Sequence, residues 1–308
     1  MTLSQLQYTL AVAKYGNFTL AAEKSNVTQP TLSMQVQKLE EELGALIFDR
    51  STKPIKLTNI GEIIILQSKN IVEESQKMKY LIDQEKGVVE GEFRLGIIPT
   101  VMPTLLPLFL NTFLKKFTKV SLKIEELNTQ NFIEQILDGR LDAGIGATPL
   151  DNSKLIENPL YYEPFVGYIP ESHPLHKNKK IEINDLKNGK VLILEDGHCF
   201  RNQIINLCNI NTNNKNLSIK SGSFETMINL ANEGLGMTIL PYMQTLVLSD
   251  KNQTNLRFFD DPAPAREISL IYSKSQFKLP IIFALNKVID SVIRGTIKFE
   301  NVKIITPK

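Results

Sequence analysis

The feature that most limits the fold of this chain is an alternation of short apolar segments with helical patterns in its second two thirds. Residues 93–98, 121–126 and 143–146 have the pattern of strands. Apolar residues at helical spacing separate them over 103–117 and 131–137. Such alternation predicts parallel strands flanked by helices, with ligands bound at the carboxyl ends of the strands.

The same pattern continues toward the end of the chain. Further strands are expected at 191–194, 217–220, 237–240 and 268–272. Two blocks of this kind, with the chain crossing between them, predict a two-lobed α/β domain over residues 92–308. We expect lobe I to comprise about 92–164 plus 267–300, and lobe II about 165–266.

Residues 1–57 have a different pattern, that of short helices followed by a small hairpin. Ser4 is the expected cap of a first helix, residues 20–25 form a second, and Thr28 caps a third. An apolar stripe of the third helix should face the core: Leu32, Val36, Leu39 and Leu43. Two helices, a tight turn and a polar-faced third helix are typical of a winged helix-turn-helix domain.

The polar face of this third helix and the hairpin would form the DNA surface. The helix presents Thr31, Ser33, Gln37 and Lys38, and the hairpin presents Arg50 and Lys53. Contacts from the hairpin to phosphates would add affinity and register. Charge does not argue for DNA, because residues 1–86 carry ten basic and ten acidic side chains. A helical bundle with a merely solvated polar face is the alternative.

Residues 58–86 have the pattern of one long helix, in which Ile64, Ile71 and Met78 follow one another seven residues apart. That spacing suits a helix–helix seam between two copies of the chain. Docking of the helix against its own domain is the alternative. The glycines in the segment 87–91 interrupt the helical pattern and predict a hinge there.

Composition narrows the class of protein. No apolar run is long enough to cross a membrane, and the first residues lack the pattern of a secretory signal. We therefore expect a cytoplasmic protein. Its two cysteines do not suffice for a secreted disulfide scaffold, so they are either inert core thiols or a transient, sensory pair.

Cys199 is predicted to stand at the N-terminus of a helix, directly after a strand and the sequence Gly197-His198. The helix dipole and free backbone N–H groups at such a position favour thiolate over thiol, and Arg201 would add positive charge. A thiolate attacks peroxide to give a sulfenic acid, which a second thiol converts to a disulfide.

Cys208 lies nine residues after Cys199. In an intact helix the two residues are separated by about 13–14 Å along the axis and lie on opposite faces. A disulfide needs Cα atoms within roughly 7 Å, so either the pair never bonds or the helix must unwind. Cys208 shares a predicted buried face with Phe200, Ile204 and Leu207, so unwinding would cost several kcal/mol of burial.

The N-terminal part closely resembles the DNA-binding domain of LysR-type transcription regulators. The match is carried by FTLAAEKSNVTQPTLSMQVQKLEEELGALIFDRS at residues 18–51 and by PIKLTNIG at 54–61. The resemblance implies double-stranded promoter DNA as partner, with Gln29, Pro30, Thr31 and Ser33 near base edges or backbone. It also implies a homodimer through the long helix, a homotetramer, and contact with RNA polymerase.

The regulatory part also resembles this family. SGSFETMINLANEGLGMTILP at 221–241 is typical of its periplasmic-binding-protein-like effector domains, and GHC-x8-C resembles the motif of the peroxide-sensing OxyR branch. The resemblance implies hydrogen peroxide as signal, Cys199 as the peroxidatic and Cys208 as the resolving cysteine, and activation of antioxidant genes. It further implies that Thr100 and Thr129 hold peroxide oxygens, that His198 is a hydrogen-bonding neighbour, and that Arg266 is the cation favouring thiolate.

Two other functions fit the residues. A LysR-type regulator that binds a small metabolite between its lobes would make the cysteines incidental. A thiol peroxidase would turn over peroxide at Cys199 and Cys208, but a DNA-binding unit argues against an enzyme. The sequence has no cluster with metal-ligand spacing and no glycine-rich phosphate loop, so we expect no cofactor.

Overall fold

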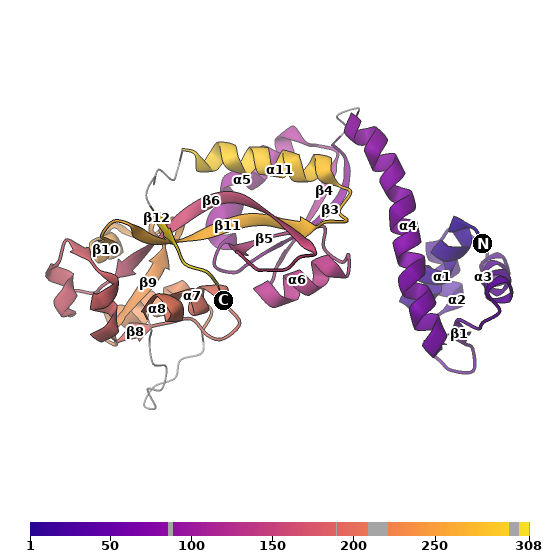
Figure 1. Ribbon diagram of the computed structural model, residues 1–308, viewed down its shortest axis with the longest axis horizontal. Coiled ribbons are helices and arrows are strands. Elements are labelled where there is room, and N and C mark those ends of the chain that lie inside the picture. Colours follow the sequence, from indigo (N-terminus) through magenta and orange to yellow (C-terminus); the bar gives the residue numbers. More distant parts are fainter. Residues whose placement is uncertain (86–88, 189, 209–220, 296–301, 308) are drawn as a thin grey trace. The chain divides into compact units, whose positions relative to one another are not determined.

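The computed structural model describes residues 1–85, 89–188, 190–208, 221–295 and 302–307. The chain forms two compact units, Met1–Lys86 and Gly87–Lys308, each with its own hydrophobic core (Figure 1). The strand predicted at 217–220 and the first residues of the predicted hinge lie outside the described residues.

The first unit contains the three short helices, the hairpin and the long helix that its sequence predicts. They are α1 (Leu3–Tyr15), α2 (Phe18–Lys24), α3 (Gln29–Leu43), β1 (Phe48–Asp49), β2 (Lys56–Leu57) and α4 (Asn59–Glu85). Thr28 caps α3 as predicted, since its hydroxyl accepts the N–H of Thr31. The cap predicted at Ser4 is wrong: Thr2 and Gln5 accept each other's backbone N–H groups, which starts α1 earlier.

The core face of α3 is largely as expected. Leu32, Val36 and Leu39 are fully buried, but Leu43 is 41% exposed. The helix ends at Leu43, and Gly44 turns the chain away with a φ of +63°. The last predicted member of the stripe therefore lies beyond the core.

A buried carboxylate joins the hairpin to α3. Glu40 on α3 accepts the N–H groups of Ile47 at 2.8 Å and Phe48 at 3.2 Å. It also pairs with the guanidinium of Arg50 at 2.7 Å, which lies 5.1 Å from the centre of the Phe18 ring. Arg50 thus has a structural role that the sequence did not indicate.

The long helix α4 carries both buried and exposed apolar side chains. Ile64 is partly buried and Val72 is buried against the core of its own unit. For Ile64 this agrees with the alternative, docking against its own unit, and the seam between two copies stays a prediction. Other apolar side chains of the helix are exposed, and we call them the α4 stripe: Ile60, Ile63, Leu66, Ile71 and Met78.

The second unit is built on one continuous sheet. Its strands are β3 (Gly91–Ile97), β4 (Val120–Glu126), β5 (Ala143–Thr148), β6 (Leu155–Tyr168), β7 (Lys180–Ile181), β8 (Val191–Leu192), β9 (Met237–Pro241), β10 (Leu256–Phe259), β11 (Ala263–Ser273) and β12 (Val302–Ile304). The central order is β4-β3-β5-β11-β6-β10-β7. The parallel pairing expected for β3, β4 and β5 is confirmed. An all-parallel sheet is wrong, because β6 and β11 pair antiparallel with each other and with their other long neighbours.

Helices cover the sheet and divide its apolar side chains into two clusters. They are α5 (Met102–Lys116), α6 (Thr129–Leu137), α7 (Cys199–Cys208), α8 (Phe224–Asn232), α9 (Tyr242–Thr245), α10 (Asp250–Gln253) and α11 (Leu279–Ile293), with 3-10 turns at Pro174–Lys177 and Ile183–Asn188. Figure 1 shows α5 and α11 on one side of β3 and β5, and α6 on the other. Beyond the two long strands, a second cluster surrounds α7, α8 and β9.

The two clusters meet at the start of α7. Cys199 packs with the first cluster, whereas Phe200, Ile204 and Leu207 of the same helix pack with the second. The fold therefore places the predicted reactive cysteine at the junction between two cores. The lobe boundaries proposed from the sequence stay a prediction.

None of the helices in the described part of the chain combines the length and apolar character that a membrane crossing requires. Within the same residues, no three His, Cys, Asp or Glu side chains are grouped so as to hold a metal ion.

Candidate functional site

The backbone before α7 sets the position of Cys199. Gly197 has a φ of +95°, a conformation that favours glycine, and it lets the chain turn from the segment after β8 into the helix. The prediction that Cys199 opens a helix is confirmed. Its thiol is free and its side chain is 8% exposed. First-turn N–H groups of a helix lack intrahelical acceptors and stabilise an anion placed there.

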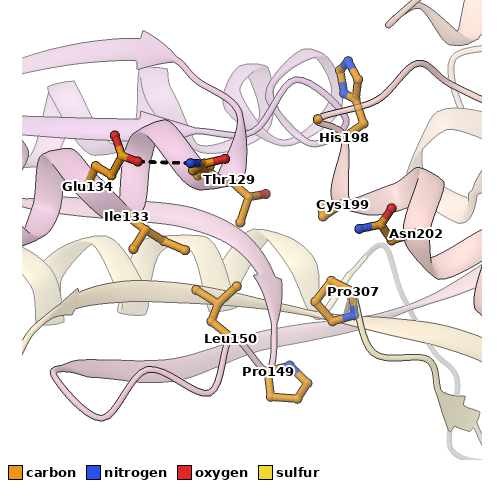
Figure 2. A pocket seen from close by; sticks show the side chains of 11 residues that line it. Thr129, Ile133, Glu134, Pro149, Leu150, His198, Cys199, Asn202 and Pro307 are labelled. Atoms are coloured by element: carbon orange, nitrogen blue, oxygen red, sulfur yellow. Dashed lines mark hydrogen bonds between the residues drawn. The ribbon is translucent and has the colours of Figure 1, made fainter.

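A pocket of about 420 Å³ adjoins this helix start (Figure 2). The N-terminus of α6 contributes Thr129, and the start of α7 contributes His198, Cys199 and Asn202. Pro307, close to the end of the chain, forms part of its wall. The structure thus gathers three of the predicted site residues, Thr129, His198 and Cys199, around one cavity.

The hydroxyl of Thr129 is buried but not hydrogen-bonded within the described residues. A buried hydroxyl without a partner costs about 1–3 kcal/mol relative to a bonded one. Since the side chain lines the pocket, a polar ligand there would satisfy it.

His198 is held by close packing. Its ring lies against the backbone of Gly222, where an added Cβ would come within 2.6 Å of Nε2. Its carbonyl oxygen accepts the N–H of Arg201 at 3.0 Å in the first turn of α7. Glycine at position 222 therefore leaves room for the imidazole beside the pocket.

The sequence suggested that Arg201 adds positive charge near Cys199, but in the structure its charge is paired. Its Nε pairs with Asp196 Oδ1 at 2.8 Å, and its Nη1 donates to the carbonyl of Leu194 at 2.9 Å. The carboxylate balances the guanidinium, so the residue fastens the start of α7 to the preceding loop.

Thr100 and Arg266 form a second polar cluster, which does not line the pocket. Arg266 donates to the hydroxyl of Thr100 at 2.9 Å and to its carbonyl at 3.0 Å. Its guanidinium lies 5.2 Å from the centre of the Phe200 ring. Phe200 is the residue that directly follows Cys199 in the chain. The two predicted residues are thus linked to α7 through Phe200.

Glu163, the counter-ion of Arg266, was not predicted from the sequence. The two side chains pair at 2.7 Å with 1% exposure each, and Glu163 also accepts the N–H of Met243 at 2.8 Å. Burial and the adjacent carboxylate raise the pKa of the neighbouring Tyr161 hydroxyl well above its usual value, which keeps it neutral. One signal for this pair was present in the sequence: Glu163 is a single carboxylate in an otherwise apolar segment. A carboxylate buried with such a segment needs a partner of opposite charge.

Cys208 is the last residue of α7, and its side chain lies outside the described part of the structure. The burial predicted for Phe200, Ile204 and Leu207 is confirmed. While α7 is intact, eight helical residues lie between the two cysteines. Helix geometry then keeps them about 13–14 Å apart along the axis, too far for a disulfide.

The predicted DNA surface is accessible on the first unit. Its exposed members are Gln29, Pro30, Thr31, Gln37, Lys38, Arg50 and Lys53, while Ser33 is half-buried. Two of them make bonds within α3: the Thr31 hydroxyl lies 2.8 Å from that of Thr28, and Gln37 donates to Glu41 at 2.9 Å.

Comparison with protein families covers both units. Residues 3–62 match the bacterial regulatory helix-turn-helix proteins of the lysR family, and residues 86–293 match the LysR substrate binding domain. The chain is 31% identical over 274 residues to the hydrogen peroxide-inducible genes activator of Haemophilus influenzae, covering 88% of this chain and 90% of that protein. This chain belongs to the OxyR branch of the LysR family.

Further OxyR proteins resemble the chain. The DNA-binding transcriptional dual regulator OxyR of Escherichia coli K12 is 32% identical over 88% of this chain and 89% of its own length. A full-length OxyR of Pseudomonas aeruginosa with one cysteine replaced by aspartate has a TM-score of 0.75 at 31% identity, covering 97% of this chain and 99% of that one. A peroxide-bound cysteine-to-serine OxyR variant of Corynebacterium glutamicum has a TM-score of 0.63 at 27% identity, with coverages of 96% and 93%. The predicted fold class, a helix-turn-helix domain followed by a two-lobed α/β domain, is confirmed.

Proposed function

We propose that this DNA-binding regulator senses hydrogen peroxide through oxidation of Cys199 and a disulfide with Cys208, and that the resulting change in shape alters its binding to promoter DNA and activates antioxidant genes. The observation that carries the proposal is a free Cys199 thiol at the first position of α7, beside a pocket with an unpartnered hydroxyl. Relatives named as hydrogen peroxide-inducible genes activators support the same signal.

The chemistry consumes one peroxide for each disulfide. The Cys199 thiolate attacks one peroxide oxygen, the O–O bond breaks, and the leaving hydroxide is protonated to water. The Cys208 sulfur then displaces the oxygen of the Cys199 sulfenic acid, which leaves as a second water. The two thiols supply both electrons. A hydrogen-bond donor at the departing oxygen accelerates the first step. Thr129 lines the pocket, and its hydroxyl has no partner among the described residues, so we assign it this role.

The disulfide acts as a switch because α7 must unwind before Cys199 and Cys208 can bond. Phe200, Ile204 and Leu207 are buried, and Phe200 packs edge-to-face on Phe165 and Phe224. Withdrawal of such side chains costs about 1.5–3 kcal/mol each. The oxidised state is then strained relative to the reduced one, which makes the disulfide easy to reduce and the sensor resettable.

Promoter DNA footprinting before and after one equivalent of hydrogen peroxide tests this function. We expect the protected region to change on oxidation and to return after treatment with a dithiol. An unchanged footprint, with thiol titration showing that both cysteines had been oxidised, would contradict the proposed link between thiol chemistry and DNA binding.

Thr129→Val tests the role of the pocket hydroxyl, because valine keeps the shape and removes the donor. We expect the second-order rate constant for oxidation of Cys199 by hydrogen peroxide to fall about five- to tenfold, as for the loss of one hydrogen bond near a developing charge. Quenched-flow alkylation with mass spectrometry measures this rate. Thr254→Val, which removes a hydroxyl bonded within its own turn, is the matched control. An unchanged rate in Thr129→Val would remove this residue from the site.

We further propose that the chain is a homodimer through the α4 stripe. Ile63 is 59% exposed and Leu66 60% exposed, although both are large apolar side chains. Such a row on a long helix matches the pairing of helices between two chains. Association of dimers into tetramers and contact with RNA polymerase are proposed from the family resemblance alone.

Ile63→Lys combined with Leu66→Lys tests the dimer. Two charges per copy in an apolar seam should weaken association by at least about a hundredfold and yield monomers in multi-angle light scattering. Glu225→Lys makes an acid-to-lysine change at an exposed position of α8, outside α4, and should leave the mass unchanged. If the double lysine variant has the same mass as wild-type protein, the interface lies elsewhere. The mass measured for wild-type protein also distinguishes a dimer from a tetramer.

A further inference from the structure

The C-terminal segment, residues 302–307, returns to the reactive site. β12 pairs in parallel with the start of β11, placing Ile304 opposite Ala265, immediately before Arg266. The N–H of Ile305 then donates to the carbonyl of Ala265 at 2.7 Å. Figure 1 shows the end of the chain beside α7.

A buried side chain of α7 is bonded to this segment. Gln203 is completely buried, and its Nε2 donates to the carbonyl of Ile305 at 2.8 Å. The side chain of Ile305 packs against the apolar cluster that also holds Phe200, Ile204 and Leu207. The bond therefore joins the tail to the middle of the helix whose ends carry the two cysteines.

The last described residue completes the pocket. Pro307 is buried and lines the pocket near Cys199 and Asn202 (Figure 2). The tail thus contacts the reactive site twice, as a wall of the pocket and as an acceptor for Gln203.

We propose that residues 302–307 are a positioning element of the sensor, which holds α7 in its helical form through Gln203 and so favours the reduced state. This inference rests on the proposed function. Gln203 reaches the Ile305 carbonyl from its place on the helix, so unwinding of α7 breaks the bond. An interaction made in only one of two states shifts the equilibrium toward that state.

The coupling is reciprocal, as any linkage between two sites must be. Oxidation of the cysteine pair loosens the tail from β11, and removal of the tail makes α7 easier to oxidise. Lys303 is exposed on β12, so its cleavage by trypsin reports release of the tail. We expect the peptide bond after Lys303 to be cut faster in oxidised than in reduced protein.

The direct test combines two changes in the full chain: Gln203→Met, which keeps volume and removes the donor, and a stop codon in place of Val302. In dithiothreitol redox buffers, each should shift the thiol–disulfide equilibrium toward the disulfide by about fivefold or more, as for the loss of a buried hydrogen bond. Together they should shift it no further than the truncation alone, because Gln203 acts through the tail. Gln253→Met, which removes an exposed amide-to-carbonyl bond far from α7 in sequence, is the control for the substitution itself.

Hydrogen exchange of the reduced protein separates this inference from the proposed function. Residues 199–208 should exchange faster in both variants even without peroxide. Unchanged exchange and an unchanged redox equilibrium in Gln203→Met, or additive effects in the combined variant, would overturn the positioning role. A different result would separate the two proposals: wild-type protein that forms no disulfide, with faster exchange in the variants. It would contradict the proposed sensor chemistry but support the restraint of α7 by residues 302–307.

Discussion

Replacing Cys199 with serine is expected to abolish the response of the chain to hydrogen peroxide. Serine keeps the size of the side chain at the start of α7 but provides no thiolate to attack the O–O bond. In vitro transcription from a bound promoter should then give the same output with and without peroxide. The reduced variant should still bind DNA, since Cys199 lies in the second unit and the helix-turn-helix in the first.

Cys208→Ser is the matched control for the chemistry. It should still be oxidised at Cys199, to a sulfenic acid that a dimedone probe traps, but should form no intramolecular disulfide. A regulator that binds a metabolite in the 420 Å³ pocket would keep its response in both variants. Steady consumption of peroxide well beyond one equivalent by wild-type protein would favour the thiol peroxidase.

Glu163→Gln is expected to lower the free energy of unfolding of the second unit by about 3–5 kcal/mol, because it leaves a buried charge without its counter-ion. Arg266 is 1% exposed, and Glu163 is its ion-pair partner. Glutamine still accepts a hydrogen bond, so the loss comes mainly from charge. Urea unfolding followed by hydrogen exchange of the β6 and β11 peptides reports on this unit alone.

The combined variant Glu163→Met with Arg266→Met separates charge from packing. Removal of both ions should be much less destabilising than the sum of the single changes, since no uncompensated charge stays buried. A double variant as unstable as that sum would show that the Thr100 and Met243 contacts, and not the ion pair, hold this region together.

The local elements were largely predictable from the sequence, because caps and apolar spacing act over a few residues. The start of α7 at Cys199 and the cap of α3 at Thr28 are examples. The long strand β6 was not predicted, since LIENPLYYEPFVGY contains prolines and charges that are typical of loops. Its pairing with β11 joins segments about a hundred residues apart, so no local pattern indicates the antiparallel register.

The site was predictable where its residues are adjacent in sequence. Gly197, His198 and Cys199 follow one another, and the last two line one pocket in the structure. Glu163 and Pro307 reach the site from β6 and from the end of the chain, so only the fold reveals them. Arg201 was predicted to add positive charge near Cys199, but it pairs with Asp196. This pairing depends on loop geometry, which the sequence does not reveal.

The most direct test of the account is peptide mass mapping of Cys199 and Cys208 after less than one equivalent of hydrogen peroxide, with hydrogen exchange measured on the same sample. We expect a bond between these two cysteines and faster exchange of the amides over 199–208, which are helical in the structure. Two free thiols, or a bond formed with the protection of this helix unaltered, would contradict it.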